Sequence, residues 1–288
     1  MNNTELYQQL LILEKQGLVI GKRLNGRVLF KYHNKVFYNN LWHTSPELLE
    51  ARGIVFDETT GECLQRPFHK IFNVGENGTK EPDPEEHTKV MKVDGFMCAA
   101  SKLSSGEIFV TTTGSMSSDF VDLATKWVDT LNTSAFYEGY TYLFEVCDKS
   151  DPHIVDEDEG IYLLSIRRKD TGTYMECLTV TNEQEELGSK IIDWRGISDT
   201  KEGWVYYNSL GVPVAKTKTP YYLSKKALMR MGKANVNKMY DNPNEFKQRL
   251  DEEFYSLYDY LLEGYTKEVY ASFTEQERRQ IIERYFNE

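Results

Sequence analysis

The stretch "VMKVDGFM", residues 90–97, places a lysine inside an apolar run, with an Asp-Gly pair directly behind it. A lysine in an apolar strand is costly unless its charge is paired or its pKa is lowered. An ordinary alternative is that the strand ends at Asp94-Gly95 in a hairpin turn and that Lys92 points to solvent. The stretch alone favours this alternative, so the role of Lys92 depends on what the other segments supply.

The composition is that of a folded globular protein. A chain of 288 residues can bury a substantial core as one large domain or two smaller ones, and it contains 19 Tyr, 14 Phe and 4 Trp. No window approaches the roughly 18 apolar residues of a membrane span. The first residues lack the basic segment and cleavage site of a secretion signal, and the four cysteines form no CxxC pair. We therefore expect a cytoplasmic protein with reduced thiols and no membrane partner.

The charges are segregated along the chain. The net charge of −11 argues mildly against a nucleic-acid partner, but residues 216–240 contain seven Lys or Arg and no Asp or Glu. Residues 156–160 and 251–254 are acidic by contrast. A basic island in an acidic protein is a candidate phosphate-binding face, although a solvated helix face explains the charge pattern equally well.

The order of predicted elements indicates an α+β fold. Residues 4–16 have the apolar spacing of an amphipathic helix, with Leu6, Leu10 and Leu13 on one side. From about residue 18 to 220 the chain is rich in short β-prone runs separated by Gly, Asp, Asn and Pro. Helices are predicted over 118–131 and 182–192 within this region.

After Pro220 the strand patterns stop and only helical patterns follow. Asn242 precedes Pro243 as an N-cap followed by a first-turn proline, and apolar residues then mark one face as far as Leu261. Thr274 and Glu277 have capping-box spacing. We expect one domain over residues 1–222 and a small all-helical domain over 223–288.

A reactive lysine needs neighbours, because an amine nucleophile must be neutral and its pKa must be lowered by desolvation or nearby cations. Lys216 and Lys218 are two residues apart, so both ammonium groups leave the same face of a strand. They would repel each other unless an anion such as a triphosphate lies between them. The alternative is an edge strand that uses lysines to prevent aggregation.

Two other strands carry single carboxylates. Glu145 is embedded in "YTYLFEV", and Glu202 precedes a glycine and an aromatic strand. Isolated carboxylates in apolar strands suit the Mg²⁺ that accompanies nucleotide phosphates, or a hydrogen bond to a ribose hydroxyl. Each could equally be a strand-end residue that faces water.

Arginine is the natural bidentate partner of phosphate, and the segments "ARGIVFD" and "QRPFHKIFN" place Arg52, Arg66 and Lys70 beside strands. The chain contains no GxxxxGK[ST] or GxGxxG loop, which disfavours a P-loop or Rossmann nucleotide site.

These segments form an ordered set whose spacing resembles the covalent nucleotidyltransferases, which include ATP-dependent DNA ligases, RNA ligases and mRNA capping enzymes. The matching segments are KVDG at 92–95, FEV at 144–146, EGWV at 202–205 and KTK at 216–218. The upstream "ARGIVFD" and "RPFHKIFNVGEN" look specifically like RNA ligases of the bacteriophage RNA ligase 1 type, which repair broken tRNA. The resemblance spans about residues 28–226 and implies the antiparallel sheets and flanking helices of the ligase nucleotidyltransferase fold.

The resemblance also implies a role for each matching residue. Lys92 would attack the α-phosphate of ATP and form a lysyl-AMP, and Lys216 and Lys218 would stabilise the transition state. Glu202 would help to place Mg²⁺ or Mn²⁺, and Glu145 would contact the ribose or the metal. The remaining matches would bind the nucleotide or serve later steps: Arg52, Lys70, Met91, Asp94 and Gly95.

The implied substrate is RNA with 5′-phosphate and 3′-hydroxyl ends, for which cleaved tRNA is one candidate, and we expect a monomer. Two positions depart from the family pattern: Phe96 replaces a small polar residue and Thr113 replaces a lysine. Phe30 and Tyr32 are candidates to stack on adenine, although such aromatics more often belong to a core. Two alternatives are a non-catalytic RNA-binding protein on this fold and a GTP-dependent capping enzyme or DNA ligase. The second would need an OB-fold of strands after residue 218.

Overall fold

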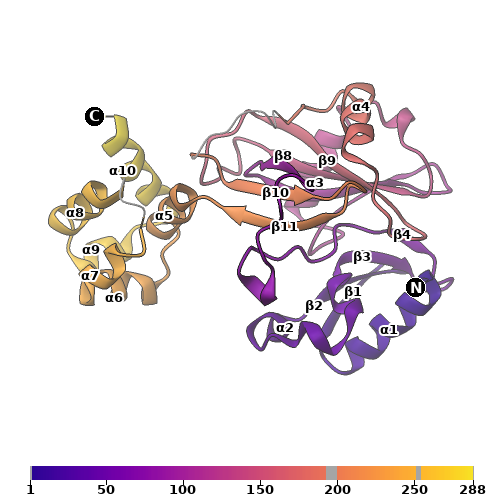
Figure 1. Ribbon diagram of the computed structural model, residues 1–288, viewed down its shortest axis with the longest axis horizontal. Helices are drawn as coiled ribbons and strands as arrows, with labels where there is room; N and C mark the ends of the chain where they lie inside the picture. The colour runs from indigo at the N-terminus through magenta and orange to yellow at the C-terminus, as the bar shows by residue number, and fades with distance from the viewer. Residues whose placement is uncertain (1, 193–199, 251–253, 288) are drawn as a thin grey trace.

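The computed structural model describes residues 2–192, 200–250 and 254–287, which form a sheet-rich body and a separate helical unit (Figure 1). The body contains three antiparallel sheets, so the predicted α+β class is confirmed. In the described part of the chain, no helix has the length and apolar character needed to cross a membrane.

The N-terminal sheet is covered by the predicted first helix. Its strands follow the order β1 Val19–Leu24, β2 Arg27–Tyr32, β3 Arg52–Asp57 and β4 Cys63–Gln65. Helix α1 Asn3–Lys15 buries Leu6, Leu10 and Leu13 as predicted, and Asn2 caps its first turn. The connection between β2 and β3 contains the short helices α2 Asn34–Tyr38, η1 Leu41–Thr44 and η2 Pro46–Leu49.

The other two sheets meet at the KVDG segment. One has the order β11 Pro213–Lys218, β10 Gly203–Tyr207 and β5 Thr88–Lys92. The other has the order β7 Ile108–Thr112, β6 Phe96–Lys102, β8 Tyr140–Cys147 and β9 Gly160–Arg168. Because β5 and β6 belong to different sheets, residues 93–95 carry the chain from one sheet to the next. The hairpin alternative for Asp94-Gly95 is therefore wrong.

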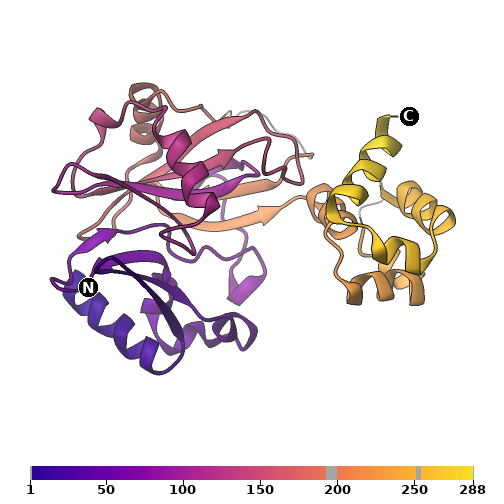
Figure 2. The ribbon, with the colours of Figure 1, turned by 180° about the vertical axis from the view of Figure 1, so that it is seen from behind.

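Helices cover the third sheet. Helix α3 Asp119–Val128 lies across it, as the view from behind shows (Figure 2), and α4 Cys177–Leu187 packs beside β9. The helix predicted over 182–192 begins earlier, at Cys177, and ends where Gly188 adopts a left-handed conformation with φ of 72°. Short 3₁₀ turns occur at η3 Glu76–Gly78 and η4 Thr133–Ala135.

The described residues after Thr219 form helices and no strand, which excludes an OB-fold there. The helices are α5 Pro220–Met229, α6 Lys233–Asp241, α7 Pro243–Lys247, α8 Tyr255–Gly264, α9 Lys267–Ser272 and α10 Glu275–Asn287. The predicted capping box is present, because Thr274 and Glu277 exchange hydrogen bonds of 2.7 and 3.2 Å. Asn242 stands at the N-cap of α7, but its side chain makes no capping hydrogen bond.

The apolar face predicted from Phe246 to Leu261 is divided between two helices, because α7 ends at Lys247 and α8 begins at Tyr255. Both contribute to one core that also includes Ile154 and Val155 from the loop after β8. The helical unit is therefore packed onto the body through that loop. Helix α5 crosses the domain boundary that we predicted at 222/223.

Candidate active site

A cavity of about 240 Å³ lies between the β5–β10–β11 sheet and the β6–β8–β9 strands. Five of the predicted nucleotide-site residues line it: Arg52, Met91, Lys92, Glu145 and Lys216. Most of the remaining wall is apolar or aromatic and includes Phe68, Ile71, Met97, Leu164 and Tyr207. A largely apolar pocket with a few convergent charged groups is the usual form of a small-molecule site.

Strand register brings the two motif lysines to the same carboxylate. Gly203 on β10 pairs with Lys92 on one side and with Lys218 on the other. A Cβ atom at Gly203 would lie only 2.0 Å from the carbonyl oxygen of Thr217, so the strands can approach this closely only because residue 203 is glycine. Glu202, which precedes this glycine, consequently lies between the two lysines.

Glu202 forms a buried bridge between them. Lys92 Nζ donates to Glu202 Oε2 at 2.5 Å, and Lys218 Nζ donates to Oε1 at 2.7 Å. The glutamate is only 2% exposed. Its burial opposes ionisation, but Lys92 and Lys218 outweigh that effect and hold the pKa of Glu202 below its ordinary value.

The protonation state of Lys92 is the opposite of the one that a nucleophile requires. Burial alone would lower the pKa of Lys92, but the carboxylates of Glu145 and Glu202 outweigh burial and raise that pKa above its ordinary value. We expected desolvation or nearby cations to lower the pKa of Lys92. The neighbouring carboxylates instead favour its charged ammonium form.

Glu145 lies beside Lys92 and differs from Glu202 in its own charge. Its Oε1 accepts a hydrogen bond of 3.2 Å from the Gly95 N–H, and it is 6% exposed. Burial raises the pKa of Glu145 to about 7, although Lys92 opposes the shift. A Cβ atom at Gly95 would lie 2.4 Å from the Val146 carbonyl oxygen, so the glycine of KVDG allows its turn to touch β8.

Lys216 is the lysine whose pKa is lowered. Burial, together with the nearby charges of Arg52 and Lys70, lowers the pKa of Lys216 to about 7. A group of cations that repel one another around a buried lysine favours the binding of an anion. Lys70 itself does not line the cavity, because its Nζ is 2.7 Å from Glu76 Oε1 and 4.5 Å from the ring centroid of Phe72.

The chain from residue 50 to 219 matches a protein-family model described as RNA ligase. This match covers more than half of the sequence. The chain belongs to the RNA ligase family. Every motif residue around the cavity lies within the matched segment.

Two named relatives agree with this family, and a solved structure shares the fold. RNA ligase 1 of Bacteriophage TS2126 is 35% identical over 150 residues, which are 45% of this chain and 37% of the relative. A protein of Thermovibrio ammonificans, named provisionally as an RNA ligase, is 26% identical over 157 residues, which are 51% of this chain and 41% of the relative. The chain thus spans less than half the length of these curated relatives. An archaeal ATP-dependent RNA ligase has the same fold, with a TM-score of 0.57 at 15% identity over 96% of this chain and 74% of that one.

The two departures from the family pattern lie outside the cavity lining. Phe96 packs edge-on against Phe120, with ring centroids 5.1 Å apart, and so contributes to packing. The backbone of Thr113 passes close to Gly53, because a Cβ atom at Gly53 would lie 3.0 Å from Thr113 Cα. Position 113 is therefore near Arg52, the residue before Gly53.

The two aromatic candidates for adenine stacking belong to the core of the N-terminal sheet, the alternative named for them, and do not line the cavity. Phe30 is fully buried among the rings of Tyr7 and Phe56, and Tyr32 packs edge-on against Trp42. Part of the apolar wall of the cavity comes instead from a segment with no nucleotide motif, such as Leu164 on β9, while Phe68 lies in the predicted RPFHKIFN segment. Only the alternation of residues along β9 could have indicated Leu164.

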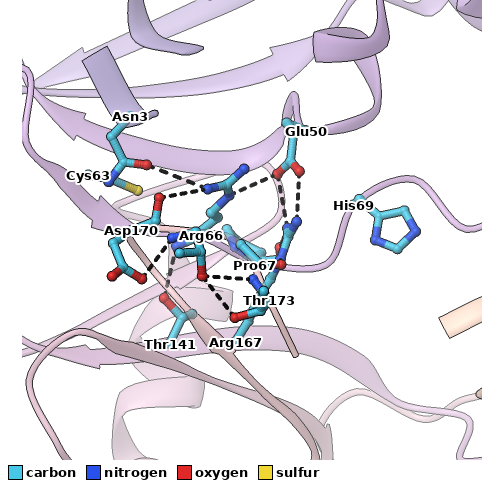
Figure 3. A network of polar contacts seen from close by, with 12 residues as sticks. Asn3, Glu50, Cys63, Arg66, Pro67, His69, Thr141, Arg167, Asp170 and Thr173 are labelled. Carbon is cyan, nitrogen blue, oxygen red and sulfur yellow. Dashed lines mark hydrogen bonds and ion pairs between the residues drawn. The ribbon is translucent and has the colours of Figure 1, made fainter. Parts of the chain in front are cut away.

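Arg66 belongs to a buried charge network and does not line the cavity (Figure 3). Glu50 Oε2 accepts hydrogen bonds from Arg66 Nε at 3.2 Å and from Arg167 Nη1 at 3.0 Å, while Oε1 accepts one from Arg167 Nη2 at 2.7 Å. Arg167 also donates to the carbonyl oxygens of Pro67 and Gly172. The network ties the segments next to Arg52 and Lys70 to strand β9.

Asp94 of the KVDG segment connects the site to the helical unit. Its Oδ2 accepts a 2.9 Å hydrogen bond from the Val155 N–H, and the residue is absent from the cavity wall. On the other side of the same loop, Arg279 of α10 donates to the carbonyl oxygens of Pro152 and His153. One loop, residues 152–155, is thus hydrogen-bonded both to α10 and to the turn that follows Lys92.

Proposed function

We propose that this chain is an ATP-dependent RNA ligase that joins 5′-phosphate and 3′-hydroxyl ends through a lysyl-AMP at Lys92. The observation that carries the proposal is the position of Lys92 in a cavity that also contains Lys216, with Glu202 joining Lys92 to Lys218. Family membership supports the same reaction. RNA repair, with cleaved tRNA as one substrate, is the biological role that we propose for it.

In the first step, the Lys92 amine attacks the α-phosphorus of ATP. An N–P bond forms, the bond from that phosphorus to the bridging oxygen breaks, and pyrophosphate leaves with the bond's electron pair. Lys216 and Lys218 are placed to stabilise the negative charge that develops on the α-phosphate oxygens. Lys92 must lose a proton before it attacks, and the carboxylates of Glu145 and Glu202 oppose that loss.

The carboxylates fit a divalent cation only together with a nucleotide. No group of three or more His, Cys, Asp or Glu residues suited to a metal is found within residues 2–192, 200–250 and 254–287. Mg²⁺ is commonly held by one or two carboxylates plus substrate phosphates, and Glu145 and Glu202 supply such a pair. When bound, Mg²⁺ or Mn²⁺ would neutralise charge on the phosphate oxygens.

In the later steps, an oxygen of the RNA 5′-phosphate attacks the adenylyl phosphorus and displaces the Lys92 amine. The resulting adenylated end has AMP as a good leaving group. Attack by a 3′-hydroxyl on the 5′-phosphorus then forms the phosphodiester bond and releases AMP.

The test is incubation with α-labelled ATP or GTP and Mg²⁺, followed by denaturing electrophoresis. We expect an acid-labile adduct from ATP that is lost in Lys92→Ala and retained in Lys89→Ala. Lys89 is a matched control because it lies exposed on the same strand, over the ring of Trp204 at 4.3 Å. Sealing of 5′-phosphorylated RNA and DNA strands is then compared.

Labelling from GTP alone would instead support capping chemistry. Preferential sealing of DNA would support a DNA ligase. The absence of any adduct, from folded protein whose mass shows no prior adenylylation, would contradict the ligase proposal and support a non-catalytic RNA-binding protein.

A further inference from the structure

A row of cationic side chains begins at the cavity and continues along helix α5. Tyr222, Lys226 and Arg230 are four residues apart, so they lie one above another on the same helix face. Lys218, on the strand that leads into α5, has its Nζ 4.5 Å from the ring centroid of Tyr222. The Nζ of Lys226 is 5.6 Å from the same centroid. The ring of Tyr222 therefore links Lys218, on the strand, to Lys226 on α5.

The central member of the row is a cation without a carboxylate partner. Within the described residues, no salt bridge pairs Lys226 with an acidic group, although the protein carries a net charge of −11. Burial and the neighbouring Lys218 lower the pKa of Lys226. Lys218 is already paired with Glu202, so Lys226 is the one of these two cations that a further anion would stabilise.

The end of the row is accessible to a ligand. Arg230 Nε is 2.7 Å from Glu275 Oε1, but the two side chains are 38% and 47% exposed. An exposed pair of this kind is weak and can be replaced by contact with a phosphate. Neither Lys226 nor Arg230 lines the cavity, and α5 leads away from the sheets toward the helical unit in both views (Figures 1 and 2).

We infer that Lys226 and Arg230 on α5 bind successive phosphates of the RNA strand whose end is placed at Lys92. The inference deepens the proposed ligase function and rests on it. A triphosphate has only a short anionic chain, and Arg52, Lys92 and Lys216 already line the cavity. A polynucleotide continues beyond the reacting end and can follow α5, with its backbone phosphates paired to Lys226 and Arg230.

The test measures equilibrium binding of a fluorescein-labelled, 5′-phosphorylated single-stranded oligoribonucleotide, without ATP, over a series of salt concentrations. Lys226→Ala is expected to weaken binding about tenfold, the effect of one hydrogen bond to a charged group. The slope of log affinity against log salt should fall by about 0.7, as expected for one lost phosphate contact with a single strand. Lys226→Arg keeps the charge and should bind nearly as tightly as the original protein.

The matched control is Lys15→Ala, which removes one exposed charge at the end of α1 on the body, away from α5. Equal affinity and salt slope in Lys226→Ala and Lys15→Ala would overturn the inference. So would unchanged RNA binding in Lys226→Ala combined with a raised KM for ATP in lysyl-AMP formation, which would assign Lys226 to the triphosphate. Because binding is measured without ATP, failure of the ligase proposal appears separately, as absence of the Lys92 adduct.

Discussion

Replacing Glu50 by glutamine keeps the shape of the side chain but removes the charge that faces two buried arginines. The side chains of Arg66 and Arg167 are 5% and 4% exposed, so neither can be solvated in place of the lost partner. Burial alone would raise the pKa of Glu50, but Arg167 and Arg66 outweigh burial and lower it from 4.5 to about 2. This network holds the segments that carry Arg52 and Lys70.

The magnitude can be worked out in two ways. Lowering the pKa of Glu50 from 4.5 to about 2 corresponds to about 3 kcal/mol of folding free energy at pH 7, since one pKa unit is worth about 1.4 kcal/mol. Breaking a buried ion pair by removing one partner independently costs about 3–5 kcal/mol. We therefore expect Glu50→Gln to lower the free energy of unfolding by about 3 kcal/mol and the melting temperature by roughly 6–12 °C.

The pH dependence provides a second measurement. Because the folded-state pKa of Glu50 is depressed, its stabilising contribution is complete above about pH 4.5 and is lost as the pH falls through about 2. Denaturant unfolding should therefore show a difference between the original protein and Glu50→Gln that shrinks to roughly half by pH 3.

Glu107→Gln is the matched control, because Glu107 makes the same bidentate contact with Arg27 at 3.0 and 2.7 Å, but on the surface. We expect it to change stability by less than about 1 kcal/mol. Equal effects of Glu50→Gln and Glu107→Gln at pH 7 would refute the reasoning, as would a difference that does not depend on pH.

Two further predictions concern the site. Arg279→Ala removes the donor that holds the loop bonded to Asp94. Formation of lysyl-AMP in a single turnover should therefore slow at least about fivefold, with little change in the KM for ATP, and Arg279→Lys should restore part of the rate. Equal rates in Arg279→Ala and Arg279→Lys would contradict this role. Lys216→Met should abolish lysyl-AMP formation. It should also raise the melting temperature at pH 6–7, because the low pKa of Lys216 makes its charged form unfavourable in the folded protein. The gain in melting temperature should vanish as the pH approaches 10.5, and a variant that melts no higher than the original protein at pH 6 would refute the prediction.

Local patterns were sufficient for much of the architecture. The spacing of Leu6, Leu10 and Leu13 predicted α1, and the Thr274–Glu277 spacing predicted the start of α10, because these interactions occur within one or two helical turns. The break between α7 and α8 was missed, since the apolar spacing continues across it. Propensity and periodicity describe a segment without its surroundings.

The order of motifs predicted which residues would meet. Lys92, Glu145 and Lys216 line one cavity, and Glu202 links Lys92 to Lys218, although these residues are spread over more than a hundred positions of the sequence. They could be found because the chemistry of phosphate and adenylate transfer restricts the residue types that can serve it. The apolar wall of the cavity has no such restriction on its residue types, so most of it could not be predicted from the sequence.

The charge states depended entirely on the tertiary structure. Lys92 is charged because the register of β5, β10 and β11 places Glu202 against it, while Lys216, two residues from Lys218, is surrounded by cations. The sequence by itself determined most of the elements and the candidate reacting groups, because helix periodicity and residue chemistry are local properties. Only the tertiary structure decided which of those groups are paired, since burial and Coulomb interactions depend on neighbours that are distant along the chain.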